Sequence, residues 1–264
     1  MNANDPLPHP PMSDPGPKGD RGGRGQTLDE VSRESNVDER ELAKFSALAH
    51  RWWDPTSEFR PLHEMNPVRL AHIERVAGGL QGKRVVDVGC GGGILAEAMA
   101  ARGARVTGID LAAKPLKVAM LHALESGAAI DYRLMPAEEL AAKEPGAFDV
   151  VTCMELLEHV PDPARTVAAC ARLVRPEGHV FFATINRNPR SFLFAILGAE
   201  YVLRLLPRGT HEYARFIRPS ELAAFARSAG LALEDLTGMS YNPLTRAFAL
   251  AADVGVNYIA ACRK

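Results

Sequence analysis

The chain has 264 residues, of which 47% are hydrophobic and 24% charged, a composition typical of globular rather than disordered or fibrous proteins. Its 31 basic and 32 acidic residues nearly cancel, which disfavours nucleic acid as a partner. The four cysteines form no Cys-x-x-Cys pair, and no window reaches the ~18 apolar residues of a membrane span. We therefore expect a cytoplasmic protein with reduced cysteines.

The first part of the chain predicts a tail followed by a helical cap. Residues 1–37 are rich in proline and glycine, so we expect a disordered tail that buries too little apolar surface to become ordered. Apolar residues then recur at helical spacing up to Trp53. A second helix is predicted over 67–76, with Asn66 as its N-cap. Together these helices would form a cap over residues 38–80.

Beyond residue 80, apolar runs alternate with helical patterns, which indicates an α/β fold with helices on both faces of a parallel sheet. We expect seven strands, mostly parallel. The predicted strands span 84–88, 105–109, 130–134, 148–152, 179–185, 231–236 and 257–262. The predicted helices span 94–102, 115–125, 163–174 and 220–229.

The most informative motif is a glycine turn between the first strand and the next helix, Asp87-Val88-Gly89-Cys90-Gly91-Gly92-Gly93. Glycines let a backbone turn tightly and approach a ligand without a Cβ clash. The dinucleotide fingerprint G-x-G-x-x-G would need a glycine where Ile94 stands. Asp87 would repel a pyrophosphate and suits a cationic ligand. The motif resembles the first motif of class I S-adenosylmethionine-dependent methyltransferases.

A second acid supports this interpretation. Asp110 ends the next strand about 20 residues beyond the first glycine, the place of an acid that binds ribose hydroxyls. Folds that bind NAD carry an acid at the same place, so Asp110 alone does not separate the two classes. Together, Asp87, Gly89, Gly91 and Asp110 predict a binding site for S-adenosyl-L-methionine.

The segment after the fourth strand, Met154-Glu155-Leu156-Leu157-Glu158-His159, is the candidate chemical site. A phenol acceptor has to lose a proton, and His159 could accept it because the reference pKa of histidine is about 6.5. Glu155 and Glu158 could orient the imidazole. Alternatively, Glu155, Glu158 and His159 could bind Mg²⁺ or another divalent cation. A third interpretation gives His159 a structural role only.

Narrower segments across residues 38–264 resemble the ubiquinone biosynthesis O-methyltransferase family. The resemblance implies a Rossmann-like class I methyltransferase domain acting on the phenolic hydroxyl of 2-polyprenyl-6-hydroxyphenol and 3-demethylubiquinol. It implies donor binding by Arg69, Gly89, Asp110 and Met154, and in some relatives metal binding by Glu155, Glu158 and His159. A guanidinium at Arg69 could pair with the donor's carboxylate. The resembling segments include Arg51-Trp52-Trp53-Asp54, Asn66-Pro67-Val68-Arg69-Leu70, Leu121-His122-Ala123-Leu124-Glu125-Ser126-Gly127 and Gly209-Thr210-His211.

Residues 186–218 form an insertion that the core fold does not need. From Arg187 to Arg208, arginines flank a short apolar stretch, a pattern typical of a helix in a lipid interface. A helix packed in the core or a dimer surface is the alternative. Given the polyprenylated substrate that the resemblance implies, we expect peripheral association with the inner face of the membrane. Assembly with other ubiquinone-pathway proteins is a further hypothesis.

Three other functions stay open at this point. The same fold could act on another small hydroxylated substrate, in which case the insertion would be only a lid. An NAD-type oxidoreductase is disfavoured by Ile94. A non-enzymatic membrane adaptor is disfavoured because both Asp87 and Asp110 are present.

Overall fold

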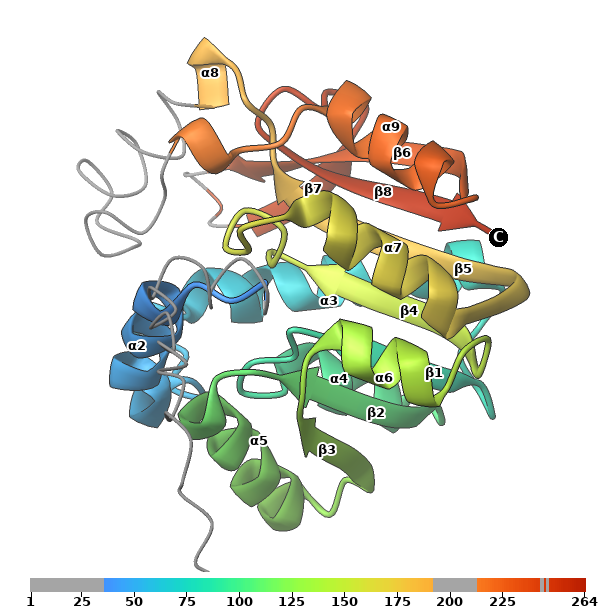
Figure 1. The fold of residues 1–264 in the computed structure, drawn as a ribbon. Helices are drawn as coiled ribbons and strands as arrows, with labels where there is room; N and C mark the ends of the chain where they lie inside the picture. Colours follow the sequence, from blue (N-terminus) through green and yellow to red (C-terminus); the bar gives the residue numbers. More distant parts are fainter. Residues whose placement is uncertain (1–35, 192–212, 243–244, 246) are drawn as a thin grey trace, which may run out of the picture.

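The computed structural model describes residues 36–191, 213–242, 245 and 247–264, whose strands form one eight-stranded sheet (Figure 1). The strand order is β3-β2-β1-β4-β5-β8-β6-β7. Strands β1 to β5 pair in parallel, and β8, β6 and β7 continue the sheet in antiparallel pairs. The strands are β1 (Arg84–Val88), β2 (Arg105–Asp110), β3 (Ile130–Leu134), β4 (Phe148–Met154), β5 (Val174–Ile185), β6 (Ala232–Asn242), β7 (Ala247–Ala251) and β8 (Asn257–Arg263).

Helices cover both faces of the sheet because successive strand residues point to opposite sides. Val85 packs into one buried cluster and its neighbour Val86 into another. The Val85 side is covered by α3 (Arg60–Ala77), α4 (Ile94–Ala101) and α5 (Ala113–Ser126). The Val86 side is covered by α6 (Ala137–Lys143), α7 (Pro163–Leu173) and α9 (Pro219–Ser228). Two short helices, α8 (Pro189–Ser191) and η3 (Tyr213–Arg215), lie between β5 and α9 in the sequence.

The N-terminal cap consists of α2 (Glu39–Leu48), η1 (Ala49–Arg51) and the turn that leads into α3. The carboxylate of Asp38 caps α2 by accepting a hydrogen bond from the Arg40 N–H at 3.0 Å. Trp52 and Phe59 stack with ring centroids 4.1 Å apart and pack on Ile94, the first residue of α4. The expected helical cap is therefore present, and it covers the edge of the sheet at which β1 leads into the glycine turn.

The second cap helix is longer than the sequence predicted. A helix does cover 67–76, but its predicted start was wrong, because α3 begins at Arg60 with a proline in its first turn. Pro67 lies inside α3, where its missing N–H costs one helical hydrogen bond. Asn66 is no N-cap: its side-chain amide donates to the Ile94 carbonyl at 3.2 Å. Packing of α3 on the sheet thus outweighs the preference of proline for the first turn of a helix.

The predicted count of seven strands was also wrong, because β7 pairs with the second half of β6. Residues 247–251 read Ala-Phe-Ala-Leu-Ala, with no β-branched side chain to favour a strand. This edge strand is largely exposed and is held by antiparallel pairing, with Asn242 opposite Ala247. Strand β6 consequently continues to Asn242 instead of ending near residue 236.

The described structure begins at residue 36, within the last two residues of the predicted tail 1–37. Asn36 is buried, and its side-chain amide donates to the Thr166 hydroxyl and to the Asp162 carbonyl. Residues 1–35 and 192–212, which contain most of the predicted tail and the apolar part of the insertion, lie outside the described residues. Among the described helices, none combines the length and the apolar character needed to span a membrane.

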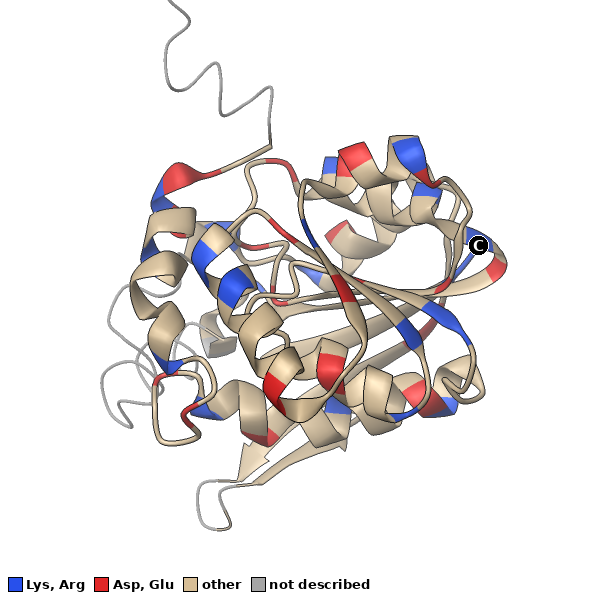
Figure 2. Ribbon diagram, turned by 90° about the horizontal axis from the view of Figure 1, so that it is seen from below, with Lys and Arg blue, Asp and Glu red and all other residues tan. Residues whose placement is uncertain are grey.

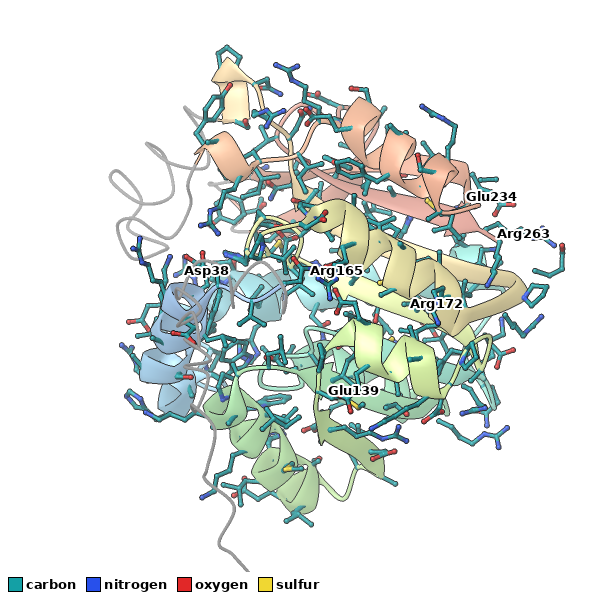
Figure 3. The ribbon with its side chains drawn as sticks, viewed as in Figure 1. Asp38, Glu139, Arg165, Arg172, Glu234 and Arg263 are labelled. Carbon is teal, nitrogen blue, oxygen red and sulfur yellow. The ribbon has the colours of Figure 1, made fainter. Side chains whose placement is uncertain are left out.

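Charged residues of both signs are interspersed over the described elements rather than gathered on one side (Figure 2). Many form ion pairs between neighbouring elements. Glu234 on β6 and Arg263 on β8 lie side by side, with a carboxylate oxygen 3.6 Å from a guanidinium nitrogen (Figure 3). This distribution agrees with the balanced charge composition of the chain.

The hydroxyl of Tyr258 joins β8 to the segment before α9. Tyr258 is fully buried, and its hydroxyl donates to the Ile217 carbonyl at 2.9 Å. We expect Tyr258→Phe to lower the free energy of unfolding by roughly 1–2 kcal/mol, because the carbonyl loses its partner inside the core. Urea denaturation measures this change. Tyr241→Phe on β6 is the control, and an equal loss there would contradict a specific role of the buried hydrogen bond.

Candidate active site

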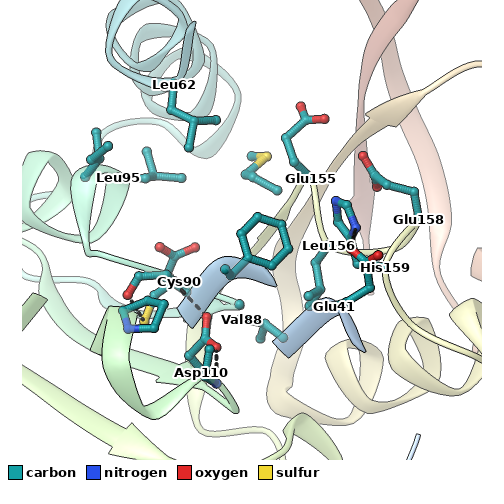
Figure 4. A pocket seen from close by; sticks show the side chains of 18 of the residues that line it. Glu41, Leu62, Val88, Cys90, Leu95, Asp110, Glu155, Leu156, Glu158 and His159 are labelled. Carbon is teal, nitrogen blue, oxygen red and sulfur yellow. Dashed lines mark hydrogen bonds and ion pairs between the residues drawn. The ribbon is translucent and has the colours of Figure 1, made fainter. Parts of the chain in front are cut away.

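A cavity of about 850 Å³ lies at the carboxyl ends of β1, β2 and β4 (Figure 4). This is the edge of a parallel sheet where ligands usually bind. The cap forms one wall, the glycine turn forms another, and the β6–β7 hairpin contributes Tyr241 and Phe248. The cavity is lined by every site residue that the sequence predicted: Arg69, Asp87, Gly89, Gly91, Asp110, Met154, Glu155, Glu158 and His159.

The glycine turn is fixed to the end of β2 by backbone and side-chain hydrogen bonds. The N–H of Gly89 donates to the Ile109 carbonyl at 2.9 Å, and the N–H of Gly91 donates to the Asp110 carboxylate at 2.8 Å. The other oxygen of Asp110 accepts from the Ala112 N–H at 2.7 Å. Burial raises the pKa of Asp110, while these backbone donors act in the opposite direction. Asp110 therefore supports the turn as well as facing the cavity.

Asp87 is a buried acid with one strong hydrogen bond. The Thr152 hydroxyl on β4 donates to its carboxylate at 2.7 Å. Burial raises the pKa of Asp87 to about 7, and the negative charge of Asp110 adds to the rise, although the hydrogen bond from Thr152 opposes it. A positive ligand charge beside Asp87 would lower this pKa again. The site is thus suited to a cationic ligand.

The cap touches the glycine turn through two tryptophans. A Cβ atom on Gly91 would lie 2.3 Å from the ring of Trp52, and one on Gly92 would lie 2.2 Å from it, so the ring needs glycine at both positions. The indole N–H of Trp53 donates to the Gly92 carbonyl at 2.8 Å. These contacts explain why the turn contains adjacent glycines.

A second group of side chains holds Trp53 in place. The ring of His122 on α5 stacks on Trp53, with centroids 3.4 Å apart and planes within 2° of parallel. The Nδ1 atom of His122 is 2.8 Å from a carboxylate oxygen of Glu97 on α4, and the Ser126 hydroxyl donates to the other oxygen at 2.8 Å. This arrangement connects α4 and α5 to the cap through Trp53.

The imidazole of His159 is oriented by the cap and not by the glutamates next to it in sequence. Its Nδ1 atom lies 2.8 Å from a carboxylate oxygen of Glu41 on α2 (Figure 4). Burial lowers the pKa of His159, but the hydrogen bond to Glu41 and the charge of Glu158 outweigh burial, so the pKa is raised overall. With Nδ1–H donating to Glu41, Nε2 is the atom left to accept a proton.

Glu155 and Glu158 have other partners. Glu155 forms an ion pair with Arg69, and its backbone has a positive φ of 50°, which is uncommon for a residue with a side chain. Glu158 is buried and accepts a hydrogen bond from the Thr184 hydroxyl at 2.8 Å. Burial and the charge of Glu155 raise the pKa of Glu158 to about 7.

These contacts do not fit the predicted metal site. Glu155 faces Arg69, Glu158 faces Thr184, and His159 faces Glu41. In the part of the chain that the structure describes, no group of three or more His, Cys, Asp and Glu side chains is placed to hold a metal ion together. The three residues therefore line the same cavity without converging on one point.

Sequence reasoning missed Glu41, Trp52 and the tyrosine of the β6–β7 hairpin as site residues. Glu41, Phe45 and Leu48 recur at helical spacing and all line the cavity. Glu41 could have been found from the sequence, because it lies on the same face of the predicted helix as the apolar residues Phe45 and Leu48. No comparable signal pointed to Tyr241, because the predicted strand ended before it.

The insertion that the sequence predicts as a membrane contact, 187–208, lies largely outside the described residues. Its first arginine is described, and it is engaged within the protein. Arg187 forms an ion pair with Glu221 on α9 and donates to the Ala214 carbonyl at 3.2 Å. Arg187 is therefore bound within the protein and is not free to contact lipid headgroups.

The sequence matches known methyltransferases. A family model described as a methyltransferase domain covers residues 62–236. A ubiquinone biosynthesis O-methyltransferase from Bordetella bronchiseptica is 66% identical over 229 residues, which is 87% of this chain and 95% of the relative. A protein of the same description from Thiobacillus denitrificans is 66% identical over 230 residues, covering 87% of this chain and 99% of the relative.

Solved structures of methyltransferases share the fold. A magnesium protoporphyrin IX methyltransferase from Synechocystis, with bound SAH, has a TM-score of 0.57 at 17% identity and covers 89% of this chain and 98% of that chain. A possible histamine N-methyltransferase from Thermotoga maritima has a TM-score of 0.58 at 19% identity, covering 85% of this chain and 98% of that chain. At these identities, the likeness supports the fold and not the substrate.

The stack of His122 on Trp53 predicts how the cap is held. We expect His122→Ala to lower the free energy of unfolding by about 1 kcal/mol, because an aromatic contact is lost. In a Trp52→Phe background, Trp53 is the one remaining tryptophan, so its fluorescence reports on the cap directly. Acrylamide should quench it more strongly after His122→Ala than after His50→Ala, a change at an exposed position of η1. Equal quenching in both variants would contradict the prediction that the stack holds the cap.

The raised pKa of Asp87 predicts a pH dependence of stability. Folding favours the protonated carboxyl, so its stabilising contribution is complete below about pH 4 and is lost as the pH rises through 7. Asp87→Asn stays uncharged, so its stability relative to the wild type should increase between pH 5 and pH 8 by a few kcal/mol, to an order of magnitude. Urea denaturation at both pH values measures this difference, and a constant difference would contradict the raised pKa.

Proposed function

This chain belongs to the family of ubiquinone biosynthesis O-methyltransferases, and from that premise we propose that its cavity holds a methyl donor next to a phenolic acceptor. The chain is an S-adenosylmethionine-dependent O-methyltransferase. Its acceptors are polyprenylated intermediates, 2-polyprenyl-6-hydroxyphenol and 3-demethylubiquinol. Family membership removes the oxidoreductase alternative, in agreement with Ile94 in place of a fingerprint glycine.

One observation carries the proposal for the site. A single cavity has Asp87 and Asp110 at the glycine turn and His159 with Glu41 on another wall. The acids that we assign to the donor and the proton acceptor that we assign to the phenol thus line one cavity, as a direct transfer between two bound reactants requires. Much of the catalysis in such a transfer comes from holding the two reactants in line.

The residues at the glycine turn fit S-adenosylmethionine. When bound, it supplies an electrophilic methyl group, whose bond to sulfur breaks as the acceptor oxygen bonds to the methyl carbon. Nine acidic side chains line the cavity, against the cations Lys44 and Arg69, so the lining suits a positively charged ligand. Arg69 has a buried Nε atom without a hydrogen-bond partner among the described residues, which leaves a donor for a carboxylate. Met154 offers an apolar surface for an adenine ring.

We assign the removal of the phenolic proton to His159. A phenolate is a better nucleophile than a phenol, so the proton has to leave the acceptor oxygen for a base. Glu41 fixes the ring by accepting from Nδ1, and Nε2 takes the proton. The carboxylate of Glu41 also stabilises the imidazolium that results. In this assignment Glu155 and Glu158 shape the electrostatics around His159 rather than orient it.

The proposal extends to the location of the enzyme. A polyprenylated acceptor resides in the bilayer, so the enzyme has to work at a membrane surface. We propose that it is a cytoplasmic protein associated peripherally with the inner face of the membrane, where other ubiquinone-pathway proteins could assemble with it. The insertion 187–208 remains a candidate contact for this surface.

The direct test is methyl transfer from labelled S-adenosylmethionine to a short-chain polyprenyl catechol, with and without a chelator. We expect the label on the phenolic oxygen, and equal rates in both conditions. A rate abolished by the chelator would assign Glu155, Glu158 and His159 to a metal ion instead. Donor binding without transfer would point to another small hydroxylated substrate.

Variants of the His159–Glu41 pair test the base. His159→Ala should lower kcat by roughly 10²–10⁴-fold with little change in donor affinity, because general-base catalysis contributes this much. Glu41→Gln should lower kcat less and shift the acid limb of the kcat profile to lower pH, since Glu41 raises the pKa of His159. His50→Ala is the matched control. Unchanged rates in His159→Ala would leave that residue with a structural role only.

A further inference from the structure

Exposed apolar side chains gather on one helix. In the described part of the chain, Met120, Leu121 and Leu124 on α5 are 43%, 51% and 80% exposed. The other exposed large hydrophobic residues, Leu134, Leu233 and Leu250, lie singly on three different strands. Scattered apolar residues are normal on a protein surface, whereas a cluster indicates an interaction.

Two lysines share this face of α5. At 100° per residue, Lys114, Lys117, Leu121 and Leu124 fall within an arc of about 80°. Both lysines are exposed, and none of the ion pairs between described residues includes either of them. Glu125 is the one acid on this face, and it lies at the end of the helix. The opposite face, with Leu116, Ala119 and Ala123, is buried against the sheet.

The position of α5 connects this face to the cavity. Pro115 in the first turn of α5 and Ala112 just before it line the cavity wall. The cap elements α2 and η1 pack against α5 (Figure 1). The start of α5 therefore lines the cavity on one side, and the exposed lysines and leucines lie on the other side of the same helix.

We propose that Lys114, Lys117, Met120, Leu121 and Leu124, the α5 surface, dock on an anionic phospholipid bilayer. The leucines enter the interface and the ammonium groups contact the headgroup phosphates. This inference rests on the proposed function, because an acceptor with a polyprenyl chain is delivered from a bilayer. Docking through α5 places the cap side of the cavity toward the membrane.

A second copy of the chain fits this surface less well than a bilayer. A contact between two copies through this face would take four lysines out of water, with Glu125 of each copy as the one acid on the face to compensate them. One exposed helix face is also much smaller than the roughly 800 Å² per partner that a stable dimer buries. An anionic bilayer complements both the charge and the apolar side chains.

Cosedimentation with vesicles tests the proposal on the full-length protein. We expect binding to vesicles of phosphatidylglycerol and phosphatidylcholine, and much weaker binding to phosphatidylcholine alone. K114Q/K117Q should lower the partition coefficient about 10- to 30-fold, and L121S/L124S about tenfold or more. Binding should also weaken at high salt, because the lysine contribution is screened.

Matched controls separate the α5 surface from other contacts. L134S/L233S changes two exposed leucines elsewhere, which are 58% and 38% exposed, and should bind like the wild type. Unchanged binding in both α5 variants would overturn the proposal and leave the insertion as the membrane contact. If L121S/L124S has a lower molar mass than the wild type in light scattering but binds vesicles equally well, the surface is a contact with a second copy. This result would also overturn the proposal.

An activity measurement keeps this inference distinct from the proposed function. The α5 variants should methylate a water-soluble catechol without a prenyl chain at the wild-type rate. They should be slower on a long-chain polyprenyl catechol embedded in vesicles. A wild-type protein that methylates neither catechol would contradict the proposed function, whatever the vesicle binding. Equal rates of wild type and variants on the embedded substrate would contradict docking through α5.

Discussion

The site depends on the hydrogen bond that the Gly91 N–H donates to the carboxylate of Asp110. Strands β1 and β2 are parallel with Val88 opposite Ile109, so the glycine turn and Asp110 emerge at one edge of the sheet. The bond fixes the turn there, and the second oxygen of Asp110 fixes the start of α5 through Ala112. Trp53 then binds the same turn from the cap. This hydrogen bond therefore links the glycine turn, the start of α5 and, through Trp53, the cap.

The chemistry of the cavity follows from two buried acids that have similar surroundings. Asp87 and Glu158 are each buried, and each accepts a hydrogen bond from a threonine on the neighbouring strand, Thr152 or Thr184. A neutral hydroxyl compensates for the loss of water less well than a cation does, so both acids have a pKa of about 7. A positively charged donor would favour their ionised forms. Binding of a positively charged donor is thereby coupled to the loss of protons from Asp87 and Glu158.

In the proposed reaction, the cap orients the base as well as enclosing the cavity. Glu41 on α2 orients His159, so the candidate base is complete only when the cap is in place. The stack of Trp53 on His122 holds the cap against α5. The outer face of α5 carries the exposed leucines and lysines. One helix thus supports the cap on its inner side and offers a surface for the bilayer on its outer side.

The fold class, the glycine turn and the two acids beside it, Asp87 and Asp110, could be predicted from the sequence, because they depend on short-range patterns of glycine, charge and apolar spacing. His159 could be found in the same way, because it stands in a local motif. The partner of His159 could not be predicted: Glu41 lies 118 residues away, and helical spacing does not say which elements meet. The same limit explains β7 and the longer α3, since pairing with β6 and packing on the sheet outweigh weak local propensities. Long-range contacts thus decided what each residue does, within a fold that local patterns had already predicted.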